Sequence, residues 1–272
     1  MGIVARIMRR VATAARERLQ SACAGGRSLW IAGLCATLAC PTSALAVEHG
    51  SADAAADRPP QLASPGPGVA GWRFVGVRKQ PPTRFVRTQV DGASALRVEA
   101  AASYGNLVHD FEPPAQAGKL AWQWRLDEPN AAADLSRRAT DDTNLKVCAL
   151  FDLPIERVPL RERHLLLIAR SLSAEPLPAA TVCYVWDTRL PAGTVVPNAY
   201  SARVRYFVLQ GTDAPSRQWV GERRDLAADF LQAFGEESAT VPALLAIAVG
   251  ADADNTRGRS LAYLRGLHWA GR

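Results

Sequence analysis

The sequence has few of the residues on which familiar enzyme chemistry depends. It contains three lysines, four histidines and five cysteines in 272 residues. The spacings Gly-x-Ser-x-Gly, His-Glu-x-x-His and Gly-x-x-x-x-Gly-Lys are absent, which excludes three common motifs for hydrolases and nucleotide-binding proteins. The histidines are scattered, and none pairs with a cysteine at metal-binding spacing, so no structural zinc site is predicted.

The first 46 residues have the pattern of an export signal. A short apolar run at 29–39 precedes small residues at 44–46, which suit a cleavage site. This run is too short to cross a bilayer, which needs about 20 residues. We therefore predict a signal peptide over residues 1–46 and a periplasmic or secreted protein. An uncleaved anchor and a lipid attached at Cys40 remain alternatives. The basic residues before the run are Arg6, Arg9, Arg10, Arg16, Arg18 and Arg27.

The positive charge of the chain belongs largely to this leader. The whole chain carries +6, and residues 1–46 contribute six arginines against one glutamate, which leaves +1 for the remainder. Proteins that bind nucleic acids need many Lys and Arg contacts to phosphates. We therefore predict no nucleic-acid partner, and no transmembrane segment once the leader is removed.

Residues 47–71 are rich in Ala, Pro, Gly and Asp and hold few bulky apolar side chains. Such a composition cannot bury enough surface to offset the entropy lost on ordering, so a disordered linker is predicted. Gly66, Gly68 and Gly71 match a dinucleotide-binding pattern, but no strand is indicated before them and no helix after them. The remaining residues, 72–272, suffice for one sandwich-sized domain.

Short strands separated by turn signals dominate the chain from Trp72 onward. Two segments have helical character, 162–171 and 225–234, and Gly235 follows the second. Many strands and few helices favour an all-β fold, a two-sheet antiparallel β-sandwich of jelly-roll-like form with one or two short helices. The expected strands are 72–77, 84–90, 95–101, 106–111, 119–126, 144–151, 181–186, 203–210, 218–223, 243–249 and 261–269.

Alternation along residues 119–126 assigns side chains to two faces. Trp122 and Trp124 share a face with leucines and are predicted to lie in the core. The opposite, polar face is expected to hold Gln123, Arg125, Arg203 and Arg205.

Two cysteines, Cys148 and Cys183, fall outside the leader within expected strands. In an oxidising compartment an even pair can form a disulfide. Small apolar thiols also fill cores without reacting. Both interpretations stay open.

A series of segments between residues 72 and 269 forms an ordered pattern. The segments are Leu120-Ala-Trp-Gln-Trp-Arg-Leu-Asp127, Asp141-Asp142 with Leu145-Lys-Val-Cys-Ala-Leu-Phe151, Tyr184-Val-Trp186, Trp219 with Glu222-Arg-Arg-Asp-Leu226, Asp229-Phe230 with Phe234-Gly235, and Gly250-Ala-Asp-Ala-Asp-Asn-Thr256. In order and spacing they resemble the DUF3047 family, a group of exported bacterial proteins of unknown function. The resemblance implies a β-sandwich outside the cytoplasm and supplies no catalytic residues.

Two acidic loops form a candidate metal site. One follows an apolar strand and the other precedes a strand, so they could meet at one end of the sandwich and bind a hard cation such as Ca²⁺. Alternatively, the side chains bond their own backbone in Asx turns. The candidate ligands are Asp252, Asp254, Asn255, Asp141 and Asp142.

Adjacent carboxylates such as Asp141 and Asp142 repel each other unless a cation compensates them. Arg137 and Arg138 are close in sequence and could do so in a salt-bridged loop. The same stretch also contains Asp127 and Asp134, which would add oxygens if the loops converge.

Three hypotheses about function follow. The first is a non-catalytic β-sandwich binding module for a glycan or another cell-envelope component, stabilised by Ca²⁺. The second is a carboxylate-dependent enzyme acting on polysaccharide or cell-wall material, because glycoside hydrolysis needs only two suitably spaced carboxyl groups. The third is a scaffold for a protein partner, which an exposed apolar patch would favour. The candidate carboxylates of the second hypothesis are Asp141, Asp142, Glu222 and Asp252.

Overall fold

The computed structural model describes residues 62–271, and side chains as far as residue 268. The predicted signal peptide and residues 47–61 of the predicted linker lie outside the described residues. Residues 62–71 form turns against the domain, where Leu62 and Val69 pack on the core. Trp72 Nε1 donates a hydrogen bond to the Ala63 carbonyl at 2.9 Å. Residues 62–71 are therefore part of the folded domain.

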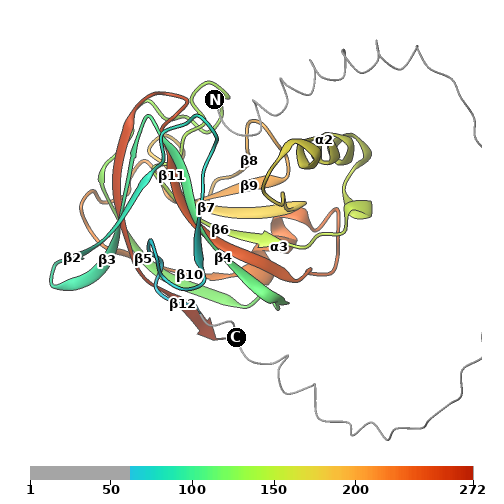
Figure 1. Cartoon of the computed structure of the whole chain (residues 1–272), viewed down its shortest axis with the longest axis horizontal. Coiled ribbons are helices and arrows are strands. Elements are labelled where there is room, and N and C mark those ends of the chain that lie inside the picture. Colours follow the sequence, from blue (N-terminus) through green and yellow to red (C-terminus); the bar gives the residue numbers. More distant parts are fainter. Residues whose placement is uncertain (1–61, 272) are drawn as a thin grey trace, which may run out of the picture.

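Two β-sheets pack face to face (Figure 1). The seven-stranded sheet has the order β1-β4-β11-β6-β7-β9-β8, and the five-stranded sheet has the order β10-β5-β12-β3-β2. The first sheet comprises β1 (Trp72–Val75), β4 (Tyr104–Ala115), β11 (Leu244–Asp252), β6 (Leu145–Phe151), β7 (Ala180–Trp186), β9 (Val204–Gln210) and β8 (Val195–Pro197). The second comprises β10 (Val220–Asp225), β5 (Lys119–Glu128), β12 (Arg259–Gly271), β3 (Ala93–Ala101) and β2 (Arg84–Val90).

The predicted all-β, two-sheet sandwich is confirmed. Among the described strands every pairing is antiparallel except that of β7 with β9. The three-residue strand β8 was not predicted, because it is too short to show alternation. Strand β4 runs past its expected end at Phe111, through Pro113 and Pro114, because Ala115 still pairs with Leu244 of β11.

Two α-helices and one short 3-10 helix complete the described region. The 3-10 helix η2 (Ile155–Arg157) precedes α2 (Leu160–Leu172), which is longer than predicted. Asp225 is the N-cap residue of helix α3 (Leu226–Phe234), and its carboxylate accepts hydrogen bonds from two backbone amides of the first turn. Gly235 follows α3 as predicted, but with right-handed φ; a Cβ there would lie 2.3 Å from the Leu231 carbonyl oxygen.

Aromatic side chains of both sheets meet in the core. Trp122 and Trp124 of β5 are buried, as predicted. Trp122 lies 5.3 Å from the Tyr184 ring and Trp124 lies 5.6 Å from the Trp186 ring, measured between ring centroids. Because β5 and β7 belong to different sheets, these contacts join the two layers.

The predicted polar face that combines Gln123 and Arg125 with Arg203 and Arg205 is wrong. Gln123 and Arg125 lie on β5 in the five-stranded sheet, whereas Arg205 lies on β9 in the seven-stranded sheet and Arg203 directly precedes it. Alternation gives the face of a side chain within one strand, and it does not say which sheet the strand joins.

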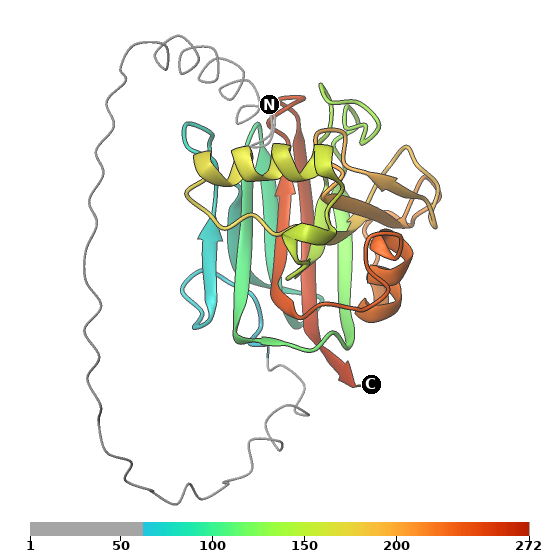
Figure 2. The same cartoon turned by 90° about the vertical axis from the view of Figure 1, so that its right-hand side faces the viewer.

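The outer face of the seven-stranded sheet carries a second, smaller apolar cluster. Helix α2 and the segment after it lie over this face, and Figure 2 shows α2 crossing in front of the strands. Strand β7 is consequently buried on both sides. Among the described residues, no helix combines the length and apolar composition needed to cross a membrane. The buried members of the cluster are Val108, Leu135, Cys148, Cys183, Val185, Tyr206, Val208, Ala246 and Ala248.

Candidate functional site

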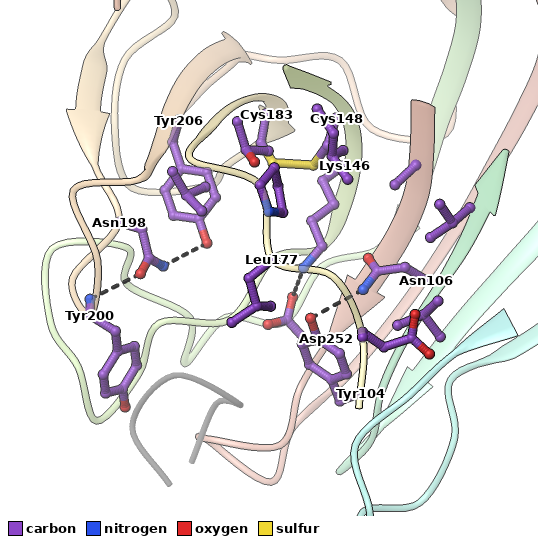
Figure 3. A pocket seen from close by; sticks show the side chains of 18 of the residues that line it. Tyr104, Asn106, Lys146, Cys148, Leu177, Cys183, Asn198, Tyr200, Tyr206 and Asp252 are labelled. Carbon is purple, nitrogen blue, oxygen red and sulfur yellow. Dashed lines mark hydrogen bonds and ion pairs between the residues drawn. A yellow bond between two sulfur atoms is a disulfide. The ribbon is translucent and has the colours of Figure 1, made fainter. Parts of the chain in front are cut away.

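A pocket of about 220 Å³ opens on the outer face of the seven-stranded sheet, and we call it the sheet-face pocket. Strands β4, β6, β7, β9 and β11 form its floor, and residues 175–178, which follow α2, form one wall. Polar side chains from these elements converge in it (Figure 3). They are Tyr104, Asn106, Asp141, Lys146, Thr181, Asn198, Tyr200, Tyr206 and Asp252, with Arg73 and Glu175 completing the set.

A buried ion pair lies at the centre of the pocket. The Lys146 ammonium is 2.9 Å from Asp252 Oδ1 and 5.3 Å from the centroid of the Tyr104 ring. Asp252 Oδ1 also accepts hydrogen bonds from the backbone amide and the hydroxyl of Thr143. Burial is the largest single influence and opposes the charge on Lys146, but the charges of Asp252, Tyr104 and Asp141 and the hydrogen bond to Asp252 together outweigh it, so the pKa of Lys146 is raised. Lys146 is therefore charged at neutral pH.

Gly250 has no side chain, and this leaves space for the Asn106 side chain at the floor of the pocket. Gly250 pairs with Asn106 of β4 and Lys146 of β6, and a Cβ there would lie 2.0 Å from Asn106 Oδ1. Asn106 Nδ2 in turn donates to the Tyr104 hydroxyl at 3.1 Å. Burial raises the pKa of Tyr104, so this hydroxyl keeps its proton at neutral pH.

Asp141 stands beside the ion pair in the same pocket. Asn198 Nδ2 donates to Asp141 Oδ2 at 2.6 Å and lies 2.9 Å from the Tyr206 hydroxyl. The other oxygen, Asp141 Oδ1, is buried and has no hydrogen-bond partner among the described residues. The Asp141 side chain thus offers one unsatisfied oxygen inside a polar pocket.

Asp141 also titrates near neutral pH. Burial, followed by the charge of Asp252, raises its pKa to about 7, while Lys146 acts in the opposite direction. Its carboxyl group can therefore donate or accept a proton under physiological conditions.

The two predicted acidic loops do meet. Asp142 Oδ1 accepts from the Asn255 backbone amide at 3.0 Å, and Asp142 Oδ2 accepts from the amide and hydroxyl of Thr256 at 2.9 and 2.6 Å. Asn255 Nδ2 donates to the Asp141 carbonyl at 2.7 Å. Carboxylate oxygens of Asp142, Asp252 and Asp254 lie within 4.8 Å of one another.

This spacing fits a Ca²⁺ ligand set, because Ca²⁺ binds oxygens at about 2.3–2.6 Å. Three of the five predicted ligands, Asp142, Asp252 and Asp254, are thus brought together. The side-chain amide of Asn255 holds the neighbouring loop, and the Asp141 carboxylate accepts from Asn198.

Neither arginine proposed to compensate the acidic pair does so. Arg137 lies 3.4 Å from Asp134, and Arg138 donates to the Ala199 carbonyl. The nearby cation is Lys146, which pairs with Asp252 and acts electrostatically on Asp141, and which the sequence places in an otherwise apolar strand. A single charged residue in an apolar strand is a feature of the sequence from which this site could have been predicted.

Glu222 does not join the other candidate carboxylates. It lies on β10 of the five-stranded sheet and accepts hydrogen bonds from Trp124 Nε1 at 3.1 Å and Gln210 Nε2 at 2.7 Å. Asp127 likewise pairs with Arg125 on β5. Of the four carboxylates proposed for catalysis, Asp141 and Asp252 line the pocket and Asp142 adjoins it.

Cys148 and Cys183 form a disulfide in the structure. They oppose each other directly on β6 and β7, and both line the sheet-face pocket. Of the two interpretations that the sequence left open, the disulfide is the one observed.

The fold and site together define a β-sandwich protein with a charged, polar pocket on the outer face of one sheet. The DUF3047 family model, described as "Protein of unknown function", matches residues 70–268, and the chain belongs to this family. The predicted resemblance is thereby confirmed. No curated protein matches the sequence.

Several solved structures are similar to the chain at a low level. Endoglucanase 3 of Trichoderma harzianum, from family GH12, is 9% identical with a TM-score of 0.39; the match covers 76% of this chain and 97% of the other. A family 11 carbohydrate-binding module of a Clostridium thermocellum cellulase is also 9% identical, with a TM-score of 0.34 and coverages of 77% and 96%. Similarity at this level does not bear on the activity of the chain.

Proposed function

We propose that this protein is a non-catalytic binding module that holds a glycan or another cell-envelope component in the sheet-face pocket. The observation that carries the proposal is Asp141 Oδ1, which is buried and unpartnered among the described residues. An unsatisfied buried polar group costs about 1–3 kcal/mol. A ligand hydroxyl would satisfy it, because a hydroxyl both donates and accepts hydrogen bonds.

The lining of the pocket suits an amphipathic ligand. Tyr104 and Tyr206 combine a ring with a hydroxyl, while Asn106 and Asn198 supply amide donors and acceptors. Apolar side chains such as Leu177 line the same pocket. A sugar presents both hydroxyl groups and apolar C–H faces, so it matches this mixture. The pocket is smaller than the roughly 300–1,000 Å³ typical for drug-sized ligands, which suits one terminal unit of a larger molecule.

The proposed place of action is outside the cytoplasm, in the periplasm or beyond the cell. The basic and apolar pattern of residues 1–46 supports export. The Cys148–Cys183 disulfide gives independent support, because disulfides persist mainly in oxidising compartments.

Ca²⁺ is the cation that we propose for the carboxylates of Asp142, Asp252 and Asp254. The carboxylate oxygens of these three residues lie within 4.8 Å of one another, and Asp252 forms an ion pair with Lys146. An added cation would reduce the repulsion among them. The ion would stabilise the joined loops that form one side of the pocket.

An enzyme acting on polysaccharide or cell-wall material is the second candidate. The observation in its favour is that Asp141, with a pKa of about 7, shares a pocket with a second carboxyl group, that of Asp252, which is paired with Lys146. Glycoside hydrolysis requires two carboxyl groups that lie close together, one of which carries a proton.

Binding and hydrolysis can be tested in one experiment. The protein is expressed with its leader, purified after export and titrated against peptidoglycan fragments and against neutral, acidic and amino-polysaccharides, with and without Ca²⁺. Calorimetry measures binding, and release of reducing sugar measures hydrolysis. We expect binding without release.

Asp141→Asn is expected to weaken binding about tenfold. Glu222→Gln is the control, because Glu222 is a half-buried carboxyl group whose pKa is also raised by burial, yet it lies outside the pocket. Absence of binding to every polymer would refute the module. Sugar release that Asp141→Asn abolishes would establish the enzyme instead.

A further inference from the structure

Helix α2 presents an unusual amount of apolar surface to solvent. Six large hydrophobic side chains are strongly exposed in the described chain, and four of them lie on this one helix. They are Leu160, Leu167, Ile168 and Leu172, with exposed fractions of 67%, 47%, 37% and 45%. Grouped apolar exposure of this kind marks an interaction surface more often than scattered residues do.

The helical period places these side chains away from the domain. Leu166 and Ala169 are buried against the sheet side of α2. At 3.6 residues per turn, Leu160, Leu167 and Ile168 fall on the opposite side. Figure 2 shows this helix on the outside of the sandwich. The apolar stripe therefore faces outward and is not part of the core.

Arginines flank the stripe on both sides. By the same period, Arg161 lies along one edge, and Arg163 and Arg170 lie along the other. The acidic residue of the first turn, Glu162, turns inward and lies 4.0 Å from Arg203. The outward surface of α2 thus carries Leu160, Leu167 and Ile168 around the polar side chains of His164 and Ser171, with arginines along its margins.

We propose that the outer face of α2 docks on a membrane surface that contains anionic lipids. A helix lying in the interface buries its apolar side chains at the acyl boundary, and Arg161 reaches the lipid phosphates. Arg163 and Arg170 add positive charge from positions where they also donate to the carbonyls of Val158 and Leu177. Anionic headgroups on both sides of the helix complement Arg161 on one edge and Arg163 and Arg170 on the other. A protein partner would need an apolar groove with acidic residues along both rims to match the same surface.

Docking through α2 would also orient the sheet-face pocket. Glu175 and Leu177, in the segment that follows α2, line that pocket. Arg170 Nε donates to the Leu177 carbonyl at 2.8 Å, which ties this wall to the helix. The pocket would therefore open beside the lipid surface.

Vesicle co-sedimentation tests the proposal with the exported, purified protein. The probes are vesicles of phosphatidylcholine alone and vesicles that also contain phosphatidylglycerol. We expect binding to the anionic vesicles that weakens with added salt. The triple variant Leu160→Gln, Leu167→Gln, Ile168→Gln should bind the anionic vesicles at least about tenfold more weakly. Arg161→Gln should bind the anionic vesicles more weakly and leave binding to phosphatidylcholine alone unchanged.

Leu231→Gln is the matched control, because Leu231 is an exposed apolar residue on α3 with a fraction of 41%. Its vesicle binding should equal that of the unmodified protein, and unchanged thermal unfolding of each variant confirms that the fold is kept. The proposal is overturned if the unmodified protein does not bind anionic vesicles, or if the triple variant binds them as strongly as the unmodified protein does. The face would be assigned to a second copy of the chain by a different result. In that case the native protein elutes as a dimer, the triple variant elutes as a monomer, and neither binds vesicles.

Discussion

Replacing Asp141 by asparagine should make the domain more stable as the pH rises, relative to the unmodified protein. The pKa of Asp141 is about 7 in the folded chain, against an ordinary value of 3.8 for an aspartate exposed to water. The folded state therefore holds a proton that the unfolded state has lost, and stability falls between pH 4 and pH 7. Because one pKa unit is worth about 1.4 kcal/mol, the full effect is about 4 kcal/mol, of which about 2 to 3 kcal/mol falls between pH 5 and pH 8.

Asparagine is close to aspartate in shape and can still accept the hydrogen bond from Asn198, but it does not titrate. Urea unfolding followed by tryptophan fluorescence at pH 5, 6.5 and 8 measures both proteins, because Trp122 and Trp124 are buried reporters in the core. The difference in unfolding free energy should shift in favour of Asp141→Asn by about 2 to 3 kcal/mol from pH 5 to pH 8. A difference that is independent of pH would refute the assignment of Asp141 as the titrating group.

Three further outcomes follow from the same pocket. Lys146→Met leaves the buried Asp252 carboxylate without its cation and should cost about 3–5 kcal/mol in urea unfolding; a loss below about 1 kcal/mol would contradict the central role of the ion pair. Reduction of the disulfide, which joins cysteines 35 residues apart, should lower the unfolding free energy by about 2–4 kcal/mol, and a variant with both cysteines replaced by serine should not respond to reductant. Ten-millimolar Ca²⁺ should raise thermal stability over EDTA by about 1–3 kcal/mol if the site has the affinity of extracellular modules. Asp254→Asn should abolish this increase in stability. Asp134→Asn should leave it unchanged, because Asp134 is a loop carboxylate outside the cluster.

The sequence predicts the layers of the fold better than the contents of the pocket. Alternation placed Trp122 and Trp124 in the core, because the two-residue period of a strand separates its faces without reference to any partner. The same rule failed for Arg203 and Arg205. Their sheet depends on the parallel pairing of β9 with β7, which no local pattern encodes.

The pocket depends on contacts between distant segments. Lys146 is visible in the sequence as a lone charge in an apolar strand, but its partner Asp252 lies 106 residues away. The raised pKa of Asp141 needs Asp252 nearby, and the only partner of its carboxylate in the described chain is Asn198. The sequence indicated that the acidic loops could share an ion if they met at one end of the sandwich. Whether they meet depends on the strand order, which the sequence does not reveal.

The strand order has a further consequence for how this chain reaches its folded state. Strand β11 lies between β4 and β6, and β12 lies between β3 and β5, so a late strand occupies an interior place in each sheet. Neither sheet can form completely until residues 244–271, which contain β11 and β12, are available. Such non-local pairing makes folding slow and leaves unpaired strand edges exposed in the meantime. A chain truncated before β11 would therefore retain two open sheets, with aggregation as the expected fate and with no pocket at all.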